Sequence, residues 1–167
     1  EGKGLRCKTG RGGLDELRKL NYPAVLRLRD RKGGEFHATL TALDENAATF
    51  AMGDAPGSVC LSVLATQWSG SYTLLWRPPA CVRDSIWPGE RGPAVAWLGE
   101  QLARLEGRAG DAPHDPVFDE AMVNEVKKFQ LACGLIPDGA VGAQTLMRLS
   151  GATDPAAPRL ARVQGGK

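Results

Sequence analysis

Two residues in the first half of the chain have types and spacing suited to acid–base chemistry. His37 opens a segment of alternating polarity, and Asp54 follows the next such segment. A histidine oriented by a carboxylate is the base that activates the nucleophile in many hydrolases. The pair therefore indicates the relic of a catalytic site. A plainer role is also open for each residue, with His37 on the polar face of a strand and Asp54 in a turn.

A nucleophile for this pair is not apparent. Cys7 lies between Arg6 and Lys8, whose charges favour a thiolate, but no helix N-terminus adjoins it. We therefore predict that the chain has no catalytic residue and is not an enzyme.

A second polar group lies toward the other end of the chain. Gln130 can both donate and accept hydrogen bonds, and the Asp138-Gly139 pair is typical of a tight turn. These residues would either bind sugar or peptide groups or make cap and turn hydrogen bonds within the fold. Both interpretations stay open. The predicted ligand-binding residues are Gln130, Asp138, Gly139, Gly142 and Thr145.

Composition excludes several classes of function. The 167 residues carry a net charge of +2, too small to indicate nucleic-acid binding. No apolar run approaches the roughly 18 residues of a membrane span. Four cysteines and two histidines without a C-x-x-C pair do not predict a metal site, and no motif predicts a cofactor.

Apolar patterns divide the chain into two units. Residues 1–79 combine short alternating segments with a helical triplet of leucines, which indicates an α+β unit. The expected elements are a helix at 14–20, strands at 24–29, 36–43, 48–52 and 71–76, and a strand end running into a short helix within 59–68. Within 36–43, Phe36, Ala38, Leu40 and Ala42 should share one face, and His37, Thr39, Thr41 and Leu43 the other.

The second half predicts a compact three-helix unit. Residues 80–91 contain Pro88 and Gly89 and are expected to be a linker. Residues 92–151 follow with helices near 95–105, 118–133 and 141–149, in which Asp119 is a plausible N-cap and Gly134 fits a helix end. Residues 152–167 are expected to form a flexible tail.

The three-helix unit resembles a known family. Its residues follow the pattern of the peptidoglycan-binding module found at the ends of many bacterial cell-wall hydrolases, except that Glu125 replaces a small residue and Gly99 the usual Gln. The resemblance implies peptidoglycan as the ligand. The matching string is Val126-x-x-Phe129-Gln130-x-x-x-Gly134-Leu135-x-x-Asp138-Gly139-x-x-Gly142-x-x-Thr145-x-x-x-Leu149.

The first unit resembles the bacteriocin-processing peptidases. The matching features are Gly4-Leu5, the strand after Pro23, His37, Asp54-Ala-Pro-Gly57 and Trp68-x-Gly70, with Ala55 inserted before Pro56. This resemblance implies a papain-like α+β fold. In that family the cysteine lies on an upstream helix in an Asp-Cys-Gly setting, which this sequence lacks.

Together the two units resemble the periplasmic region of a type II secretion assembly protein of Gram-negative bacteria, with support from segments 20–26 and 68–79. The resemblance implies a non-catalytic periplasmic anchor that binds peptidoglycan and type II secretion components, and helps the secretin insert through the wall. Self-association is a further expectation. The chain starts at Glu1 rather than Met, and we expect an ATPase unit and a membrane span upstream. The alternatives are a cysteine peptidase or wall hydrolase with a targeting module, and an interaction domain that binds no glycan.

A periplasmic location also bears on the cysteines, since thiols oxidise in that compartment. We expect at most one or two disulfides, with Cys133 as the free thiol and a Cys81–Cys133 link as the rival arrangement.

Overall fold

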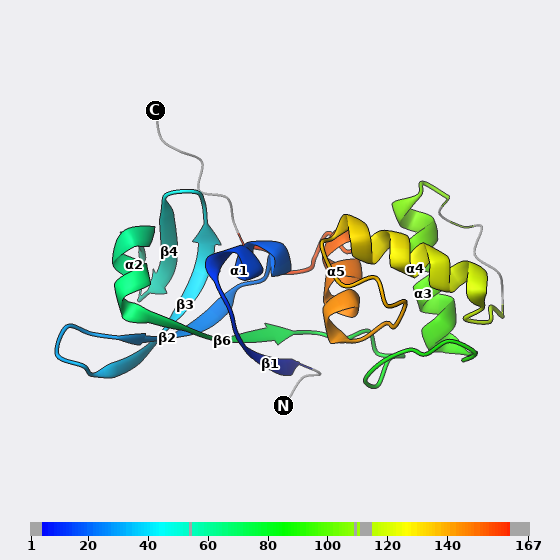
Figure 1. Cartoon of the computed structure of the whole chain (residues 1–167), viewed down its shortest axis with the longest axis horizontal. Coiled ribbons are helices and arrows are strands. Elements are labelled where there is room, and N and C mark those ends of the chain that lie inside the picture. Colours follow the sequence, from blue (N-terminus) through cyan, green and yellow to red (C-terminus); the bar gives the residue numbers. More distant parts are fainter. Residues whose placement is uncertain (1–4, 54, 109, 111–114, 161–167) are drawn as a thin grey trace. The chain divides into compact units, whose positions relative to one another are not determined.

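The computed structural model describes residues 5–53, 55–108, 110 and 115–160 (Figure 1). The chain forms two compact units. Unit 1 comprises residues 1–76 and 158–167, and unit 2 comprises residues 77–157. None of the described helices is long and apolar enough to cross a membrane.

Unit 1 is built on a six-stranded antiparallel sheet with the order β1-β6-β2-β3-β4-β5. Together with its helices this confirms the α+β class, while the papain-like arrangement stays a prediction. The strands are β1 (Arg6–Arg11), β2 (Ala24–Arg29), β3 (Glu35–Leu43), β4 (Ala47–Met52), β5 (Ala55–Cys60) and β6 (Trp68–Trp76), and the helices are α1 (Leu14–Leu20) and α2 (Leu61–Gln67).

One face of this sheet carries the core of unit 1. Alternate residues of the central strands are buried there, together with Leu17 and Leu20 of α1 and Leu64 of α2. The Tyr72 hydroxyl donates to Glu16 of α1 at 2.6 Å, and this contact ties the helix to β6. The buried strand residues include Leu26, Leu28, Leu40, Phe50, Tyr72, Leu74 and Trp76.

The alternation predicted for residues 36–43 holds only in part. Leu40 is buried on the core face as expected and pairs with the buried Phe50, but Phe36 is 41% exposed near the start of β3. A register shift between Leu40 and Ala42 marks a bulge. Such a bulge interrupts strict alternation. Beyond it, Leu43 pairs with the buried Ala48 and takes the core face, whereas Ala42 pairs with Thr49 on the other face, the reverse of the expectation.

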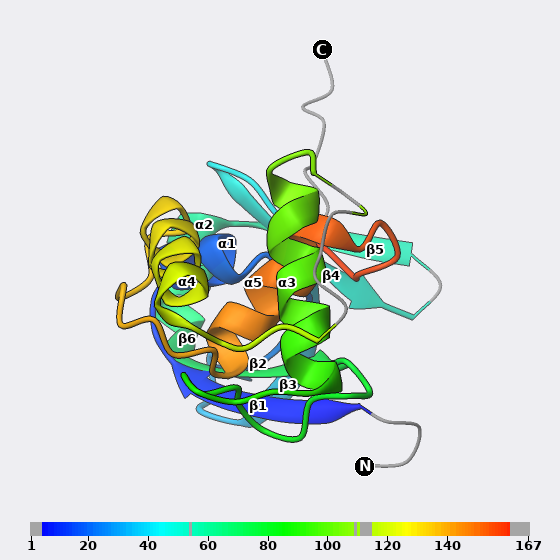
Figure 2. The same ribbon diagram turned by 90° about the vertical axis from the view of Figure 1, so that its right-hand side faces the viewer.

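Unit 2 contains α3 (Pro93–Leu105), α4 (Glu120–Ala132) and α5 (Ala143–Thr153), which are labelled in Figure 2. Pro93 occupies the first turn of α3, where its missing N–H costs nothing. The Asp119 side chain accepts a hydrogen bond from the Met122 N–H at 2.9 Å, which confirms the predicted N-cap of α4. The core includes Leu98, Leu102, Phe118, Val126, Leu146, Met147 and Leu149.

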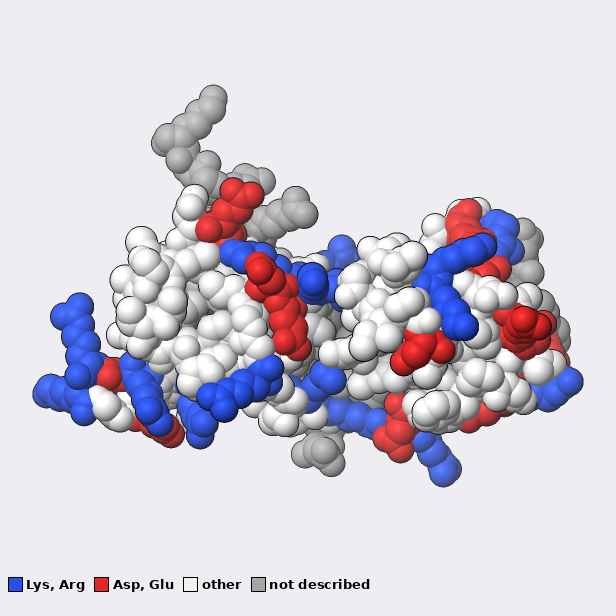
Figure 3. Space-filling view, viewed as in Figure 1, with Lys and Arg blue, Asp and Glu red and all other residues white. Residues whose placement is uncertain are grey.

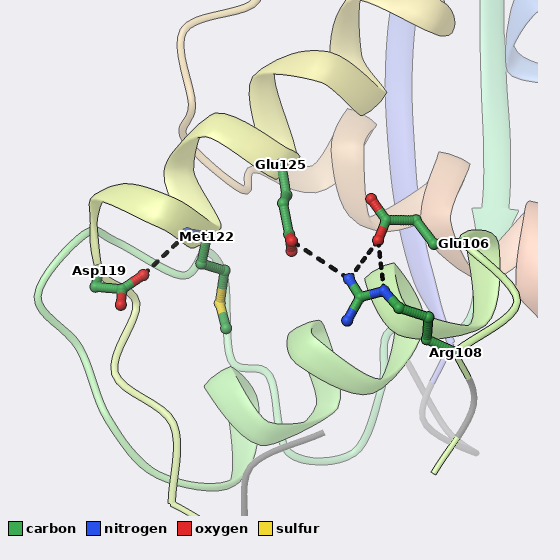
Figure 4. A network of polar contacts seen from close by, with 5 residues as sticks. All are labelled: Glu106, Arg108, Asp119, Met122 and Glu125. Atoms are coloured by element: carbon green, nitrogen blue, oxygen red, sulfur yellow. Dashed lines mark hydrogen bonds and ion pairs between the residues drawn. The ribbon is translucent and has the colours of Figure 1, made fainter. Parts of the chain in front are cut away.

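Glu125, where this chain departs from the family pattern, has a local partner. Its carboxylate lies 3.4 Å from the Arg108 guanidinium, which also pairs with Glu106 just after α3 (Figure 4). All three side chains are partly exposed, so the pairing is expected to contribute little stability. It nevertheless accounts for a charged residue at this position.

Residues 80–91 differ from the expected linker, because they are built into unit 2. Ile86 is fully buried, and it exchanges backbone hydrogen bonds of 3.0 and 3.3 Å with Val141. Further along, the Gly89 N–H donates to the Phe118 carbonyl at 2.8 Å. Pro88 and Gly89 shape turns here, whereas the apolar Val82 and Ile86 anchor the segment.

The expected flexible tail also differs in the part that is described. Helix α5 continues to Thr153. Leu160 is only 7% exposed, and its N–H donates to the Asn21 carbonyl at 3.2 Å, which places the segment in unit 1. Residues 161–167 lie outside the described part.

Candidate functional site

The predicted ligand-binding residues of unit 2 come together around one buried side chain. Gln130 of α4 is only 2% exposed. Its Nε2 lies 2.9 Å from Asp138 Oδ1, 2.9 Å from the Ala140 carbonyl and 3.2 Å from Thr145 Oγ1. Its Oε1 accepts a hydrogen bond from the Gly139 N–H at 2.9 Å. The Gln130 side-chain amide therefore holds the loop between α4 and α5 in place by hydrogen bonds.

Backbone geometry at the end of α4 brings the loop back toward Gln130. Gly134 adopts a φ of 67°, and the Leu135 N–H donates to the Gln130 carbonyl at 2.8 Å. The Gly134 N–H donates to the Leu131 carbonyl at 3.0 Å. These two bonds form a Schellman motif, which confirms the helix end predicted at Gly134 and reverses the chain.

Gly139 and Gly142 have different roles in this loop. Gly139 has a φ of 79°, and a Cβ there would lie 2.8 Å from Val123 Cγ1, so only glycine fits. At Gly142, the N-cap of α5, φ is −88° and an added Cβ would meet no atom within 4 Å. Close packing therefore requires glycine at the first position and not at the second.

The network favours a structural role for Gln130 and Thr145. Both are at least 95% buried and hydrogen-bonded within the fold, so neither side chain is presented to a ligand. Asp138, in contrast, is exposed. The Ala140 N–H and then the Gln130 amide hold the pKa of this carboxyl below its usual range. The loop thus presents an ionised carboxylate, an acceptor for hydroxyl or amide donors.

Exposed apolar residues close to this network were not predicted as functional. Ile136 is 80% exposed two residues before Asp138, and Leu131 is 69% exposed at the end of α4. The sequence did hold a signal for Ile136: an apolar residue beside Pro137, in a turn, is expected to be exposed. Apolar surface with a few polar groups is typical of ligand sites.

In unit 1, His37 is exposed on β3 and lies opposite Arg27 of β2. It helps to line a shallow hollow of about 220 Å³, together with Thr9, Val25 and Ser71. Asp54 lies outside the described residues, so its relation to His37 stays a prediction. Positive side chains follow the lower margin of this unit in the view of Figure 3.

Cys7 does not lie near His37. It belongs to β1, and strands β6 and β2 separate β1 from β3. With about 4.8 Å between neighbouring strands, the two backbones are roughly 14 Å apart, too far for proton transfer.

All four cysteines lie in the described part of the chain and are free thiols, so the Cys81–Cys133 link is not formed. Cys7 and Cys60 lie on β1 and β5, the two edges of the sheet, which is too far for a bridge. Burial raises the pKa of the Cys133 thiol, with the nearby Arg148 guanidinium acting in the opposite direction. Cys133 is therefore an unreactive thiol. Within the described ranges, no three His, Cys, Asp or Glu residues are grouped so as to hold a metal ion.

Comparison with known proteins identifies the family to which most of unit 2 is similar. Residues 91–149 match the family of putative peptidoglycan binding domains. The chain is 37% identical to "General secretion pathway protein A" of Aeromonas hydrophila over 159 residues, which cover 94% of this chain. The chain is homologous to general secretion pathway protein A. A "Putative general secretion pathway protein A" of Escherichia coli (strain K12) is 27% identical over 87% of the chain.

The homology extends over both units but not over the whole of the relatives. The chain spans 28% and 29% of the lengths of these two general secretion pathway proteins. A solved periplasmic domain of the EpsAB fusion protein, from the Vibrio vulnificus type II secretion system, is similar with a TM-score of 0.62 and 25% identity. That match covers 87% of this chain and 64% of the solved one.

Proposed function

We propose that the chain is a non-catalytic wall-binding region that binds peptidoglycan through unit 2 and serves a type II secretion assembly. The observation that carries the proposal is the match of residues 91–149 to the peptidoglycan-binding family. Those residues include the Gln130 network and the exposed Asp138 carboxylate that it holds. The printed names of the relatives and of the structural neighbour support the secretion context.

The wider role is part of the same proposal. A periplasmic location places the chain beside the wall, and the solved neighbour is itself a periplasmic domain. In that setting the chain anchors secretion components, including the secretin, to peptidoglycan and helps the secretin to cross it. Anchoring in the inner membrane would come from an upstream segment, and self-association would multiply the wall contacts.

The hydrolase alternative has less support. Within the sheet of unit 1, neither Cys7 nor Cys60 lies within reach of His37, since they are on the edge strands β1 and β5. We therefore assign unit 1 no catalytic step.

Co-sedimentation of the full chain with purified, insoluble peptidoglycan tests the proposal. We expect the chain to appear in the pellet. Asp138→Asn removes the exposed charge but keeps an acceptor for the turn, and is expected to weaken binding about fivefold. Glu120→Gln removes an exposed charge from the first turn of α4 and serves as the matched control. A wild-type chain that stays in the supernatant contradicts the proposal.

A further inference from the structure

Trp87 lies in the segment that precedes α3, outside the residues matched to the peptidoglycan-binding family. It is 56% exposed, whereas each of the other three tryptophans is buried or only partly exposed. An exposed indole leaves a large apolar surface in water, so its position relative to the Asp138 loop is of interest.

The pairing of Ile86 with Val141 fixes that position. The N–H and carbonyl groups of these two residues are joined by hydrogen bonds of 3.0 and 3.3 Å, in an antiparallel bridge. Both side chains are 0% exposed. Successive residues in such a pairing point to opposite sides, and the residue after one partner lies across from the residue before the other. Trp87 is therefore placed across from Ala140 and points away from the core.

Ala140 belongs to the loop that Gln130 holds. Its carbonyl accepts from the Gln130 amide at 2.9 Å, and its N–H donates to Asp138 Oδ1 at 2.9 Å. The backbone pairing thus places both the indole and the carboxylate next to Ala140, a residue with a small side chain. The result is a flat apolar surface beside an anionic acceptor.

We infer that Trp87 stacks on a sugar ring of the peptidoglycan glycan strand while the Asp138 carboxylate accepts a hydrogen bond from that sugar. The inference rests on the proposed function and deepens it, because it names the glycan as the bound part. A sugar ring has apolar C–H faces and carries hydroxyl and acetamido N–H donors at its edge. A carboxylate has about four acceptor positions, and Oδ1 of Asp138 uses two of them within the loop.

Charge favours the glycan over the peptide stems. Stem peptides carry more carboxylates than amino groups, so their net charge is negative and the exposed carboxylate of Asp138 repels them, whereas the acetamido groups and hydroxyls of the strand offer neutral donors. On the face of unit 2 seen in Figure 3, side chains of both signs are interspersed, so no positive patch compensates there.

Binding of the full chain to two soluble probes tests the inference: glycan strands stripped of their peptides, and the free stem tetrapeptide. We expect wild type to bind the stripped glycan in calorimetry and to bind the tetrapeptide at least tenfold more weakly. Trp87→Ala should weaken glycan binding about tenfold or more, as removal of a buried aromatic anchor does, and Trp87→Phe should keep most of it. Met52→Ala removes a similarly exposed apolar side chain, 61% exposed, from unit 1 and should have no effect.

The outcomes separate the inference from the proposed function. If wild type binds insoluble peptidoglycan but Trp87→Ala binds equally well, the inference is wrong and the proposed function stands. Preference for the tetrapeptide over the stripped glycan also contradicts the inference alone. If wild type binds neither insoluble peptidoglycan nor either probe, the proposed function fails and the inference fails with it.

Discussion

At the scale of single residues, Gln130 shows that a residue of a family motif can define the fold of a module without contacting its ligand. Its type and its place after Phe129 are compatible with a sugar ligand, yet its amide is buried and bonded to the loop. A sugar could reach it only by displacing those hydrogen bonds. The motif thus identifies a module whose loop is built around Gln130, and under the proposed function a ligand would contact the exposed side of that loop.

Replacement of Gln130 is therefore expected to affect folding first. Gln130→Ala leaves the Gly139 N–H without its partner and removes the amide donor to Asp138 and to the Ala140 carbonyl, at a cost of about 2–3 kcal/mol in the unfolding free energy of unit 2. Urea unfolding measures the change. Gln144→Ala removes an exposed glutamine from α5 and should stay within about 0.5 kcal/mol. A Gln130→Ala variant with unchanged stability but lost wall binding would show that the amide is a ligand group after all.

The lowered pKa of Asp138 gives unit 2 an acid dependence of defined sign. Because the Ala140 N–H and the Gln130 amide favour the ionised carboxylate, its pKa in the folded state lies below that of the unfolded chain. The stabilising contribution is complete above the ordinary aspartate pKa of about 4 and is lost as the pH falls through the folded-state value. Asp138→Asn should therefore lower the melting temperature at pH 7 and differ less from wild type at pH 2–3. A difference that grows on acidification would contradict this assignment.

At the scale of elements, the two loop glycines make a matched pair. Gly139→Ala introduces a Cβ 2.8 Å from Val123 Cγ1 at a φ of 79°, and we expect a loss of about 1–3 kcal/mol. Gly142→Ala adds a methyl group to open space at an ordinary φ. Its effect should be smaller, about 0.5 kcal/mol, because alanine is a poorer N-cap than glycine. Thermal unfolding of both variants compares them directly, and equal losses would rule out the close-packing explanation for Gly139.

The elements that sequence predicted well are those with long periodic patterns or strong end signals. The helix predicted near 95–105, the Asp119 cap and the Gly134 exit all lie where they were expected. The errors occur where tertiary contacts override local signals. β5 spans Ala55–Cys60, although a strand end was expected only from residue 59, since Pro56 is tolerated in an edge strand.

The residues of the candidate site in unit 2 could be predicted from the sequence, but their arrangement in space could not. Spacing alone brought together Gln130, Asp138 and Thr145. Which of them faces water depends on the chain reversal at Gly134 and on the approach of the loop to Val123. Trp87 could not be predicted, because its proximity to the loop comes from an isolated backbone bridge between distant segments.

At the scale of the whole molecule, the chain joins two units that each have their own core, and the homology to general secretion pathway protein A covers both. Unit 2 lies in the sequence between β6 and the segment at residues 158–160, where Leu160 packs with unit 1. Truncation after α5 would remove Leu160 from the core of unit 1, so experiments on the intact chain are preferable.

The intact chain is expected to show no peptidase or wall-hydrolase activity. A thiol can attack a peptide bond only when a base lies within hydrogen-bond reach of it, and Cys7 and His37 lie on strands separated by β6 and β2. Burial keeps the Cys133 thiol protonated, so it offers no alternative. Incubation with peptidoglycan fragments and a peptide panel, followed by mass spectrometry, should release no product from wild type or from His37→Ala. Turnover that is abolished by Cys7→Ser and by His37→Ala would require the two residues to meet in another arrangement of unit 1, and would restore the hydrolase interpretation.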